Sequence, residues 1–199
     1  ILNSNINITQ LKYKKSKIIN NYFPEVDELI SLDNHKLNLN YKDNNLSING
    51  EGQIQFNTNE IDEIKYLITK KDKDLSIDSE LFVKNIALDQ HDSLKTFFPQ
   101  TNKNITLKNQ KLKINFKNNN LSFSGSGIFK IDKDFEEIDY FIKKKQNKIS
   151  FSTNLNIKNT KFKIDNLNYK KKDKTKMDLQ INGELKNNKN LNINSFILN

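Results

Sequence analysis

The feature that most constrains this chain is an internal repeat. Residues 36–52, KLNLNYKDNNLSINGEG, return at residues 111–127 as KLKINFKNNNLSFSGSG. The only two prolines, Pro24 and Pro99, keep the same spacing, and each follows a phenylalanine. One structural unit is therefore built more than once, and the fold must allow such units to follow one another. The approximate boundaries of the repeats are 6–80, 81–154 and, in part, 155–199.

Within each repeat the apolar residues recur at every second position. Leu37, Leu39 and Tyr41 alternate with asparagine, and the same alternation follows from Leu46 to Ile48. A period of two is typical of a β-strand with one apolar and one wet face. The segments KDNN and KNNN between paired strands predict tight hairpin turns, because Asn and Asp tolerate a positive φ. TKKDKD and KKKQNK read as the polar tips of further hairpins.

We therefore expect an all-β fold, a mainly antiparallel, curled and repetitive sheet with a few short helices. Residues 14–22 and 90–98 are the helix candidates, and each ends at a Phe-Pro pair. We interpret residues 1–199 as one repetitive β region and as a fragment of a longer protein, because Ile1 is not an initiator methionine. No run of 18 apolar residues occurs, so the segment is not expected to cross a membrane as a helix.

Four of the five glycines lie two apart inside predicted strands, as the pairs Gly50/Gly52 and Gly125/Gly127. Glycine weakens a strand and marks a bulge, a sharp bend or the close approach of another group. One pair in each repeat predicts that these glycines bend the sheet in the same way each time. A plain bulge explains the pattern equally well.

The alternation places many large apolar side chains on a single face. Leaving one such side chain in water costs roughly 1.5–3 kcal/mol, so this face needs a cover. The cover is a second sheet in a sandwich, the sheet itself closed into a barrel, or an apolar ligand in the groove of a curled sheet. Tandem repeats can be extended without a fixed strand count, which favours the groove.

The order of these motifs resembles a known family. A Phe-Pro pair and a short strand precede L-x-N-x-K-L-x-(I/L)-x-(Y/F)-K-x-N-N-L-S-(I/F)-x-G-x-G, and I-(K/D)-Y-(L/F)-I-x-K-K follows, with LNYKKK later in the chain. This pattern is similar to the AsmA-like envelope proteins of Gram-negative bacteria, in particular the Lys- and Asn-rich versions of AT-rich alphaproteobacteria. The resemblance covers nearly all 199 residues and includes no catalytic signature.

The resemblance implies a bridge-like, repeating β-groove that binds phospholipids and supports their transport to the outer membrane, or the lipid homeostasis of that membrane. It also implies a periplasmic segment of a protein that is anchored in the inner membrane by parts outside this sequence, with other envelope proteins as possible partners. No cofactor is implied. The alternative is a structural or adhesin-like β-array or sandwich without lipid cargo.

On the groove interpretation, acyl chains would contact the apolar residues of both repeats; an ordinary sandwich core is the competing interpretation of the same residues. In the first repeat these candidate groove residues are Leu37, Leu39, Tyr41, Leu46, Ile48, Ile54 and Phe56. In the second repeat they are Leu112, Ile114, Phe116, Leu121, Phe123, Phe129 and Ile131.

Catalytic and metal sites are not expected. Asp62-Glu63 and Glu136-Glu137 recur in register, but they lie near the start of a strand and are interpreted as a solvated edge. His35 and His91 are interpreted as surface residues, because neither has a second ligand at a spacing suited to a metal. The absence of cysteine excludes disulfides and thiolate ligands. The chain also lacks a P-loop, a dinucleotide-binding loop and a nucleophile elbow.

The net charge of +9 invites a nucleic-acid interpretation, which the residue types disfavour. Every one of the 33 basic residues is lysine, whereas arginine is the preferred reader of phosphates and base edges. No aromatic residues are interleaved on the polar face as a stacking platform. Lysines at strand edges discourage aggregation between sheets, and the cluster at 170–176 is suited to anionic headgroups. No nucleic-acid partner is expected.

Overall fold

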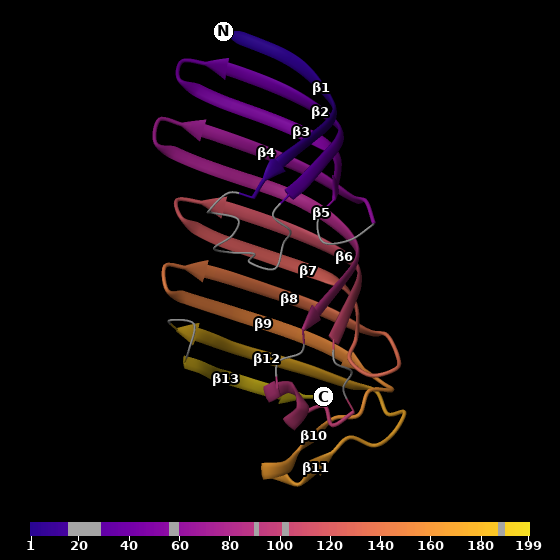
Figure 1. The fold of residues 1–199 in the computed structure, drawn as a ribbon. Coiled ribbons are helices and arrows are strands. Elements are labelled where there is room, and N and C mark those ends of the chain that lie inside the picture. The colour runs from indigo at the N-terminus through magenta and orange to yellow at the C-terminus, as the bar shows by residue number, and fades with distance from the viewer. Residues whose placement is uncertain (16–28, 56–59, 90–91, 101–103, 187–189) are drawn as a thin grey trace. The chain divides into compact units, whose positions relative to one another are not determined.

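The computed structural model describes residues 1–15, 29–55, 60–89, 92–100, 104–186 and 190–199. It contains one eleven-stranded antiparallel sheet that does not close into a barrel (Figure 1). The strands of this sheet are β1 (Leu2–Lys14), β2 (Leu29–Lys42), β3 (Asn45–Gln55), β4 (Asp62–Lys71), β5 (Asp74–Asp89), β6 (Asn104–Lys117), β7 (Asn120–Lys130), β8 (Glu136–Lys145), β9 (Lys148–Ile157), β12 (Met177–Lys186) and β13 (Asn190–Leu198).

Strands that follow one another in the sequence are also neighbours in the sheet, except that β12 follows β9. The segment between β9 and β12 holds a small hairpin of β10 (Lys163–Ile164) and β11 (Tyr169–Lys170), with the 3-10 helix η2 (Asp165–Leu167) between them. A second 3-10 helix, η1 (Asp92–Thr96), lies between β5 and β6. The predicted all-β repetitive sheet with few short helices is confirmed.

Tight turns join the strands where the asparagine-rich segments predicted them. Asp43 and Asn44 have φ values of 48° and 61°, and the equivalent Asn118 and Asn119 have φ values of 48° and 60°. Two successive residues with positive φ make a two-residue hairpin turn that matches the twist of the flanking strands. The predicted tips at 69–74 and 143–148 also form hairpin turns between paired strands.

The two helix candidates have different outcomes. The segment 90–98 contains η1, a single short 3-10 helix, so a helical turn is present but not an α-helix. In the segment 14–22, Lys14 is the last residue of β1, and residues 16–22 lie outside the described part of the chain.

The chain divides into two compact units. Unit 1 comprises residues 1–84 and 112–119, and unit 2 comprises residues 85–111 and 120–199.

In unit 1 the apolar residues of successive strands share one face. Cross-strand pairs such as Leu39 with Ile48, and Ile48 with Ile68, align because directly paired residues point to the same side of a sheet. We call this side the apolar face. In β2 to β5 of unit 1 its large apolar residues are Leu37, Leu39, Tyr41, Leu46, Ile48, Ile54, Ile64, Tyr66, Ile68, Leu75, Ile77 and Leu81.

Unit 2 has an apolar face of the same kind. Phe123 pairs with Ile142, and Ile142 pairs with Phe151, which continues the apolar row across three strands. In β7 to β9 and β12 the large apolar residues of this face are Leu121, Phe123, Phe129, Ile138, Tyr140, Ile142, Ile149, Phe151, Leu155, Ile157, Met177, Leu179, Ile181 and Leu185.

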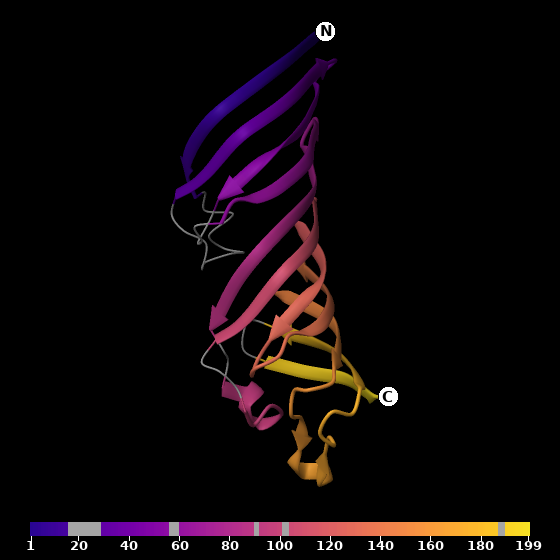
Figure 2. The same cartoon turned by 90° about the vertical axis from the view of Figure 1, so that its right-hand side faces the viewer.

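One end of the apolar face of unit 2 is covered by an aromatic cluster. Phe98 follows η1 and packs edge-on against Phe162, with the ring centroids 5.4 Å apart, and Phe162 stacks on Phe196 of β13 at 6.0 Å. The backbone N–H of Lys163 donates to the carbonyl of Phe97, which joins the two segments. Figures 1 and 2 show η1 beside the β10–β11 hairpin. This cluster forms the main buried core of unit 2.

Candidate functional site

The candidate groove residues lie in two environments. Half-buried side chains form the larger group, and Tyr41 is 42% exposed. The half-buried residues are Leu37, Leu39, Leu46, Ile48, Leu112, Ile114, Phe116 and Phe123. The buried residues are Ile54, Leu121, Phe129 and Ile131. Phe56 lies outside the described residues. Their role in binding lipid stays a prediction.

Leu112, Ile114 and Phe116 in β6 belong to the apolar side of unit 1. Lys113 forms an ion pair with Glu80 at 3.4 Å, and Asn115 donates a hydrogen bond to Asp78, so these alternate residues of β6 lie on the polar face with β5. Because side chains alternate along a strand, the apolar residues between them point the other way.

Few elements of the described chain lie outside the eleven-stranded sheet and could cover its apolar faces. Apart from the eleven-stranded sheet, the regular elements of the described residues are the β10–β11 hairpin, with two residues in each strand, and the short 3-10 helices η1 and η2. A sandwich would need a second sheet whose inner face matches the first. Within the described residues no such second sheet is present.

Charged side chains interrupt the apolar face at its two ends. In unit 1, Lys70 pairs with Leu46 and Leu75 at the hairpin end of the strands, and Asp62 pairs with Ile54 at the opposite end. Lys70 is exposed, whereas Asp62 is buried. Each of these residues therefore shares the apolar side of the sheet.

Unit 2 repeats this arrangement with Lys144 and Glu136. Lys144 pairs with Leu121 and Ile149, and Glu136 pairs with Phe129. Lysine thus stands at the hairpin end of the apolar face in both units, and a carboxylate stands at the other end.

A buried histidine organises the sheet of unit 1. His35 is 1% exposed, so its interpretation as a surface residue is wrong. Its Nε2 lies 2.8 Å from the carbonyl oxygen of Gln53, and its Nδ1 lies 3.2 Å from the hydroxyl of Tyr66. Because a carbonyl only accepts, Nε2 is the donor to Gln53, and in a singly protonated ring Nδ1 accepts from the hydroxyl of Tyr66. His91 lies outside the described residues.

Unit 2 makes the same connections with Gln110, which is also 1% exposed. Its Nε2 donates to the carbonyls of Lys108 and Ile128 at 2.9 and 3.0 Å. Its Oε1 accepts a hydrogen bond from the hydroxyl of Tyr140 at 3.2 Å. The carboxamide thus bonds to a backbone carbonyl and to a tyrosine hydroxyl in the same places as the imidazole of His35.

An asparagine precedes each of these residues and bends the strand locally. Asn34 has φ of 53° and Asn109 has φ of 51°. The pairing of β2 with β3 shifts by one residue between Asp33 and Lys36. An extra residue with left-handed backbone is a form of β-bulge, which turns the next side chain toward a new direction. In unit 1 that side chain is His35.

The glycines make room for these aromatic and polar side chains. A methyl group added at Gly50 would overlap the ring of Tyr66, and one added at Gly125 would overlap the ring of Tyr140. At Gly183 the added carbon would lie 2.5 Å from Cζ of Phe151. No glycine among the described residues has positive φ, so close approach, not backbone freedom, explains these glycines. Their predicted role in bending the sheet stays a prediction.

The second glycine of each pair receives the buried polar residue. A carbon added at Gly52 would lie 2.5 Å from Cγ of His35, and one added at Gly127 would overlap the amide of Gln110. We call each set of two glycines, tyrosine and buried polar residue a Tyr–Gly lock. Sequence reasoning missed these locks, although the tyrosine and the polar residue recur in register in both repeats.

Two carboxylates that were interpreted as a solvated edge are in fact buried. Asp62 is 1% exposed and Glu136 is 7% exposed, whereas their neighbours Glu63 and Glu137 are exposed. Burial raises the pKa of Asp62 above its ordinary value, partly opposed by the hydrogen bond from the backbone N–H of Lys84. The interpretation as an edge is therefore correct for only one carboxylate of each pair.

Glu136 receives three backbone hydrogen bonds from the turn after β9. The N–H groups of Lys158, Asn159 and Thr160 donate to its carboxylate at 3.0, 2.6 and 2.9 Å. Lys171, which is 5% exposed, donates to the carbonyl of Lys158 at 2.5 Å. Burial lowers the pKa of Lys171, and the charge of Glu136 opposes that shift. This buried network holds the chain in place after β9.

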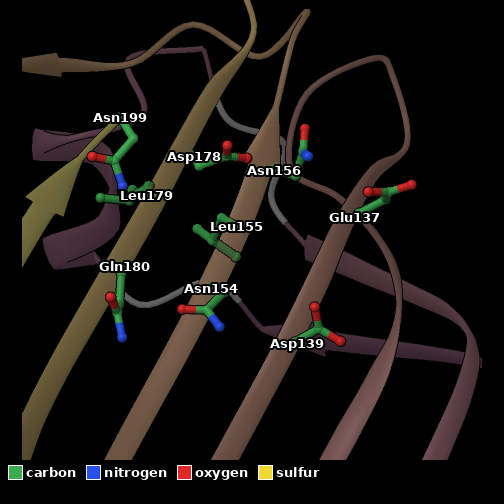
Figure 3. Close-up of a pocket in the computed structure, with 9 residues that line it drawn as sticks. All are labelled: Glu137, Asp139, Asn154, Leu155, Asn156, Asp178, Leu179, Gln180 and Asn199. Carbon is green, nitrogen blue, oxygen red and sulfur yellow. The ribbon is translucent and has the colours of Figure 1, made fainter.

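A hollow of about 290 Å³ lies on the polar face of unit 2 (Figure 3). All the lining residues except Asn199 come from β8, β9 and β12, and three of them carry carboxylates, at Glu137, Asp139 and Asp178. Among the residues that the structure describes, no group of three acidic, histidine or cysteine side chains is placed to hold a metal ion. The remaining lining residues are Asn154, Leu155, Asn156, Leu179, Gln180 and Asn199.

No helix of the described residues is long and apolar enough to cross a membrane.

Comparison with protein-family models, with curated proteins and with solved structures found no match to this chain. The resemblance to the AsmA-like envelope family therefore stays a prediction from the repeat pattern, and the function has to be argued from the apolar faces themselves.

Proposed function

We propose that the apolar faces bind the acyl chains of phospholipids, as part of a groove that conducts or holds lipid. The observation that carries this proposal is the one-sided row of large apolar side chains across β2 to β5, with Leu37, Leu39, Leu46 and Ile48 only half-buried. The described residues provide no second sheet that would cover it.

An acyl chain on this face would remove apolar surface from water. The gain is about 25 cal/mol for each Å² of apolar surface buried. Headgroups would remain in water, so the sheet need only supply an apolar surface and no chemical step. The proposed activity is passive binding, without a catalytic residue or a cofactor.

The wider setting is a further part of the proposal. The repeat pattern supports an AsmA-like, periplasmic segment of an envelope protein that serves lipid transport to the outer membrane or the lipid homeostasis of that membrane. Phospholipids are the proposed ligands, and attachment to the inner membrane would come from parts of the protein outside residues 1–199.

The aromatic core of unit 2 favours a second candidate function. Phe98, Phe162 and Phe196 cover one end of the apolar face with protein. If protein covered the whole face in this way, the repeats would form a structural or adhesin-like β-array without lipid cargo. Direct detection of bound lipid separates the two functions.

The experiment is native mass spectrometry of the protein purified from a bacterial periplasm, followed by lipid extraction. We expect bound phospholipid at more than trace stoichiometry. Ile48→Asp together with Phe123→Asp places a charge on both apolar faces and should reduce lipid loading more than it reduces the β-sheet signal in circular dichroism. The matched control is Asn49→Asp with Ser124→Asp, at the next positions, on the polar face.

A stably folded wild-type protein without lipid would contradict the proposal and favour the structural β-array. Equal loss of lipid and of sheet signal in Ile48→Asp with Phe123→Asp would also contradict it, because these residues would then serve as an ordinary core.

A further inference from the structure

The ends of the apolar face differ in charge, and the same end is positive in both units. Lys70 and Lys144 lie at the hairpin end, and Asp62 and Glu136 lie at the other end. Every apolar-face position between these charges on β4 and β8 is isoleucine or tyrosine. The face is thus an apolar strip with a lysine at one end and a carboxylate at the other.

The strip is long enough to hold one acyl chain laid along the strands. Lys70 lies eight residues after Asp62 in β4, and a strand rises about 3.3 Å per residue, which gives roughly 26 Å between the charged ends. The hydrocarbon core of a bilayer is about 30 Å thick, so the chains of one leaflet span about 15 Å. One acyl chain therefore fits between the charged ends, with its polar end at one of them.

We propose that the apolar faces select anionic lipids, with the headgroup phosphate held by Lys70 in unit 1 and by Lys144 in unit 2. This inference rests on the proposed function, because it assumes that acyl chains occupy the apolar faces. The orientation follows from charge complementarity. A phosphate gains a charge-assisted hydrogen bond from lysine at the hairpin end, and it would face a carboxylate at the other end.

The environment of each terminal charge supports the same orientation. Lys70 is exposed, so its ammonium group is within reach of a headgroup that remains in water, and Lys144, at the equivalent position of unit 2, is half-buried. Glu136 is buried and already accepts three backbone N–H groups. The carboxylate end is thus closed by protein in unit 2, and the lysine end is the accessible one.

The test compares two ligands with the same chain, 1-myristoyl lysophosphatidate and monomyristoylglycerol, below their micelle concentrations. Isothermal titration calorimetry of the whole chain measures both affinities. The wild-type protein should bind the anionic ligand more tightly. Lys70→Gln with Lys144→Gln should weaken the anionic ligand about tenfold, as expected for the loss of a hydrogen bond between charged groups, and leave the uncharged ligand unchanged.

The matched control is Lys71→Gln with Lys143→Gln. These lysines lie one residue away in the same strands, on the polar face, and their replacement changes the net charge by the same amount. The control variant should keep the preference for the anion. Circular dichroism of each variant checks that the sheet is intact.

The outcomes separate this inference from the proposed function. Binding of both ligands with equal affinity, or an equal loss in the two double variants, would overturn the headgroup site and leave acyl-chain binding standing. Failure of the wild-type protein to bind either ligand would overturn both.

Discussion

At the position where unit 1 has the imidazole of His35, unit 2 has the carboxamide of Gln110. Both side chains are buried, both donate to a backbone carbonyl of the neighbouring strand, and both accept from a tyrosine hydroxyl. The two units therefore preserve a hydrogen-bonding arrangement and not a residue type. A buried donor and a buried acceptor each need a partner, and either side chain meets that requirement.

The buried carboxylates of the two units differ in their hydrogen bonds more than His35 and Gln110 do. Glu136 accepts three backbone N–H groups, whereas Asp62 accepts one from Lys84, and its Oδ2 has no hydrogen-bond partner among the described residues. The longer side chain of unit 2 thus anchors a turn, and the shorter one of unit 1 is costly to bury. Five experiments test whether these similarities and differences determine the stability of each unit.

The largest effect is expected at the glycines beneath the tyrosines. Gly125→Ala should destabilise unit 2 by about 2–4 kcal/mol, because the methyl group displaces the ring of Tyr140 and breaks its hydrogen bond to Gln110. Gly50→Ala should act on unit 1 in the same way. Hydrogen exchange of peptides from β7–β8 and β3–β4 measures each effect separately.

The double variant Gly125→Ala with Tyr140→Ala is the control for this prediction. If the clash is the cause, the two substitutions together should cost less than the sum of their separate effects. A cost below about 0.5 kcal/mol for each glycine substitution would show that the tyrosines move aside freely, and the locks would then have little importance for stability.

Substitution of the buried carboxylate should affect the stability of the two units differently. Glu136→Gln should cost about 2–3 kcal/mol, because an amide oxygen cannot replace a carboxylate that serves three N–H groups. Asp62→Asn should change stability by less than about 1 kcal/mol, because it keeps one acceptor and removes the cost of burying a charge. Urea unfolding and hydrogen exchange of each unit measure this difference, and equal effects would contradict it.

The ionisation of Asp62 should make the stability of unit 1 depend on pH in a known direction. Its pKa is raised in the folded protein, so the folded state takes up a proton more readily than the unfolded chain. Unit 1 should therefore gain stability as the pH falls through the raised pKa toward the ordinary carboxyl range. Asp62→Asn should abolish that gain, as measured by hydrogen exchange of unit 1.

Tyr140 should make unit 2 sensitive to alkaline pH. Burial raises its pKa to about 12 from an ordinary value of 10.0. The contribution of Tyr140 to the stability of unit 2 is complete below pH 10 and is lost as the pH rises through 12, because in the unfolded chain the tyrosine loses its proton at a lower pH. The loss amounts to roughly 2–3 kcal/mol. Tyr140→Phe should remove the pH dependence and cost about 1 kcal/mol at neutral pH, whereas a persistent slope in unit 2 would assign it to another group.

The smallest effect is expected when the polar residues of the two locks are exchanged. His35→Gln and Gln110→His should each change stability by less than about 1 kcal/mol, because the donor and the acceptor are retained. His35→Leu and Gln110→Leu are the controls, and each should cost about 2 kcal/mol or more, since a carbonyl and a hydroxyl lose their buried partner. A large cost of the exchange, measured by urea unfolding, would mean that shape outweighs hydrogen bonding.

Much of the fold could be predicted from local residue patterns. The alternation from Leu37 to Tyr41 and the asparagine pairs at the turns depend only on the period of a strand and on the φ preferences of Asn and Asp. The shared face of Leu37 to Tyr41 and of Leu46 to Ile48 was also predictable, because the period of two is unbroken within each of these segments. These features require no knowledge of distant contacts.

The environments of His35, Asp62 and Glu136 could not be predicted in that way. A polar residue normally lies in water, and its burial in a sheet depends on which residue the neighbouring strand places opposite it. The bulge at Asn34 turns His35 inward, and Gly52 leaves the space that its ring occupies. Such contacts join residues that are far apart in the sequence.

The sequence by itself determined the strands, the turns, the repeat and the one-sided placement of apolar residues, because these follow from local backbone preferences and from the period of the pattern. The tertiary structure alone decided the Tyr–Gly locks, the burial of one carboxylate in each unit and the aromatic core around Phe162. The physical reason is that the register between strands, and not the order of residues within one strand, determines which side chains meet and which lose their contact with water.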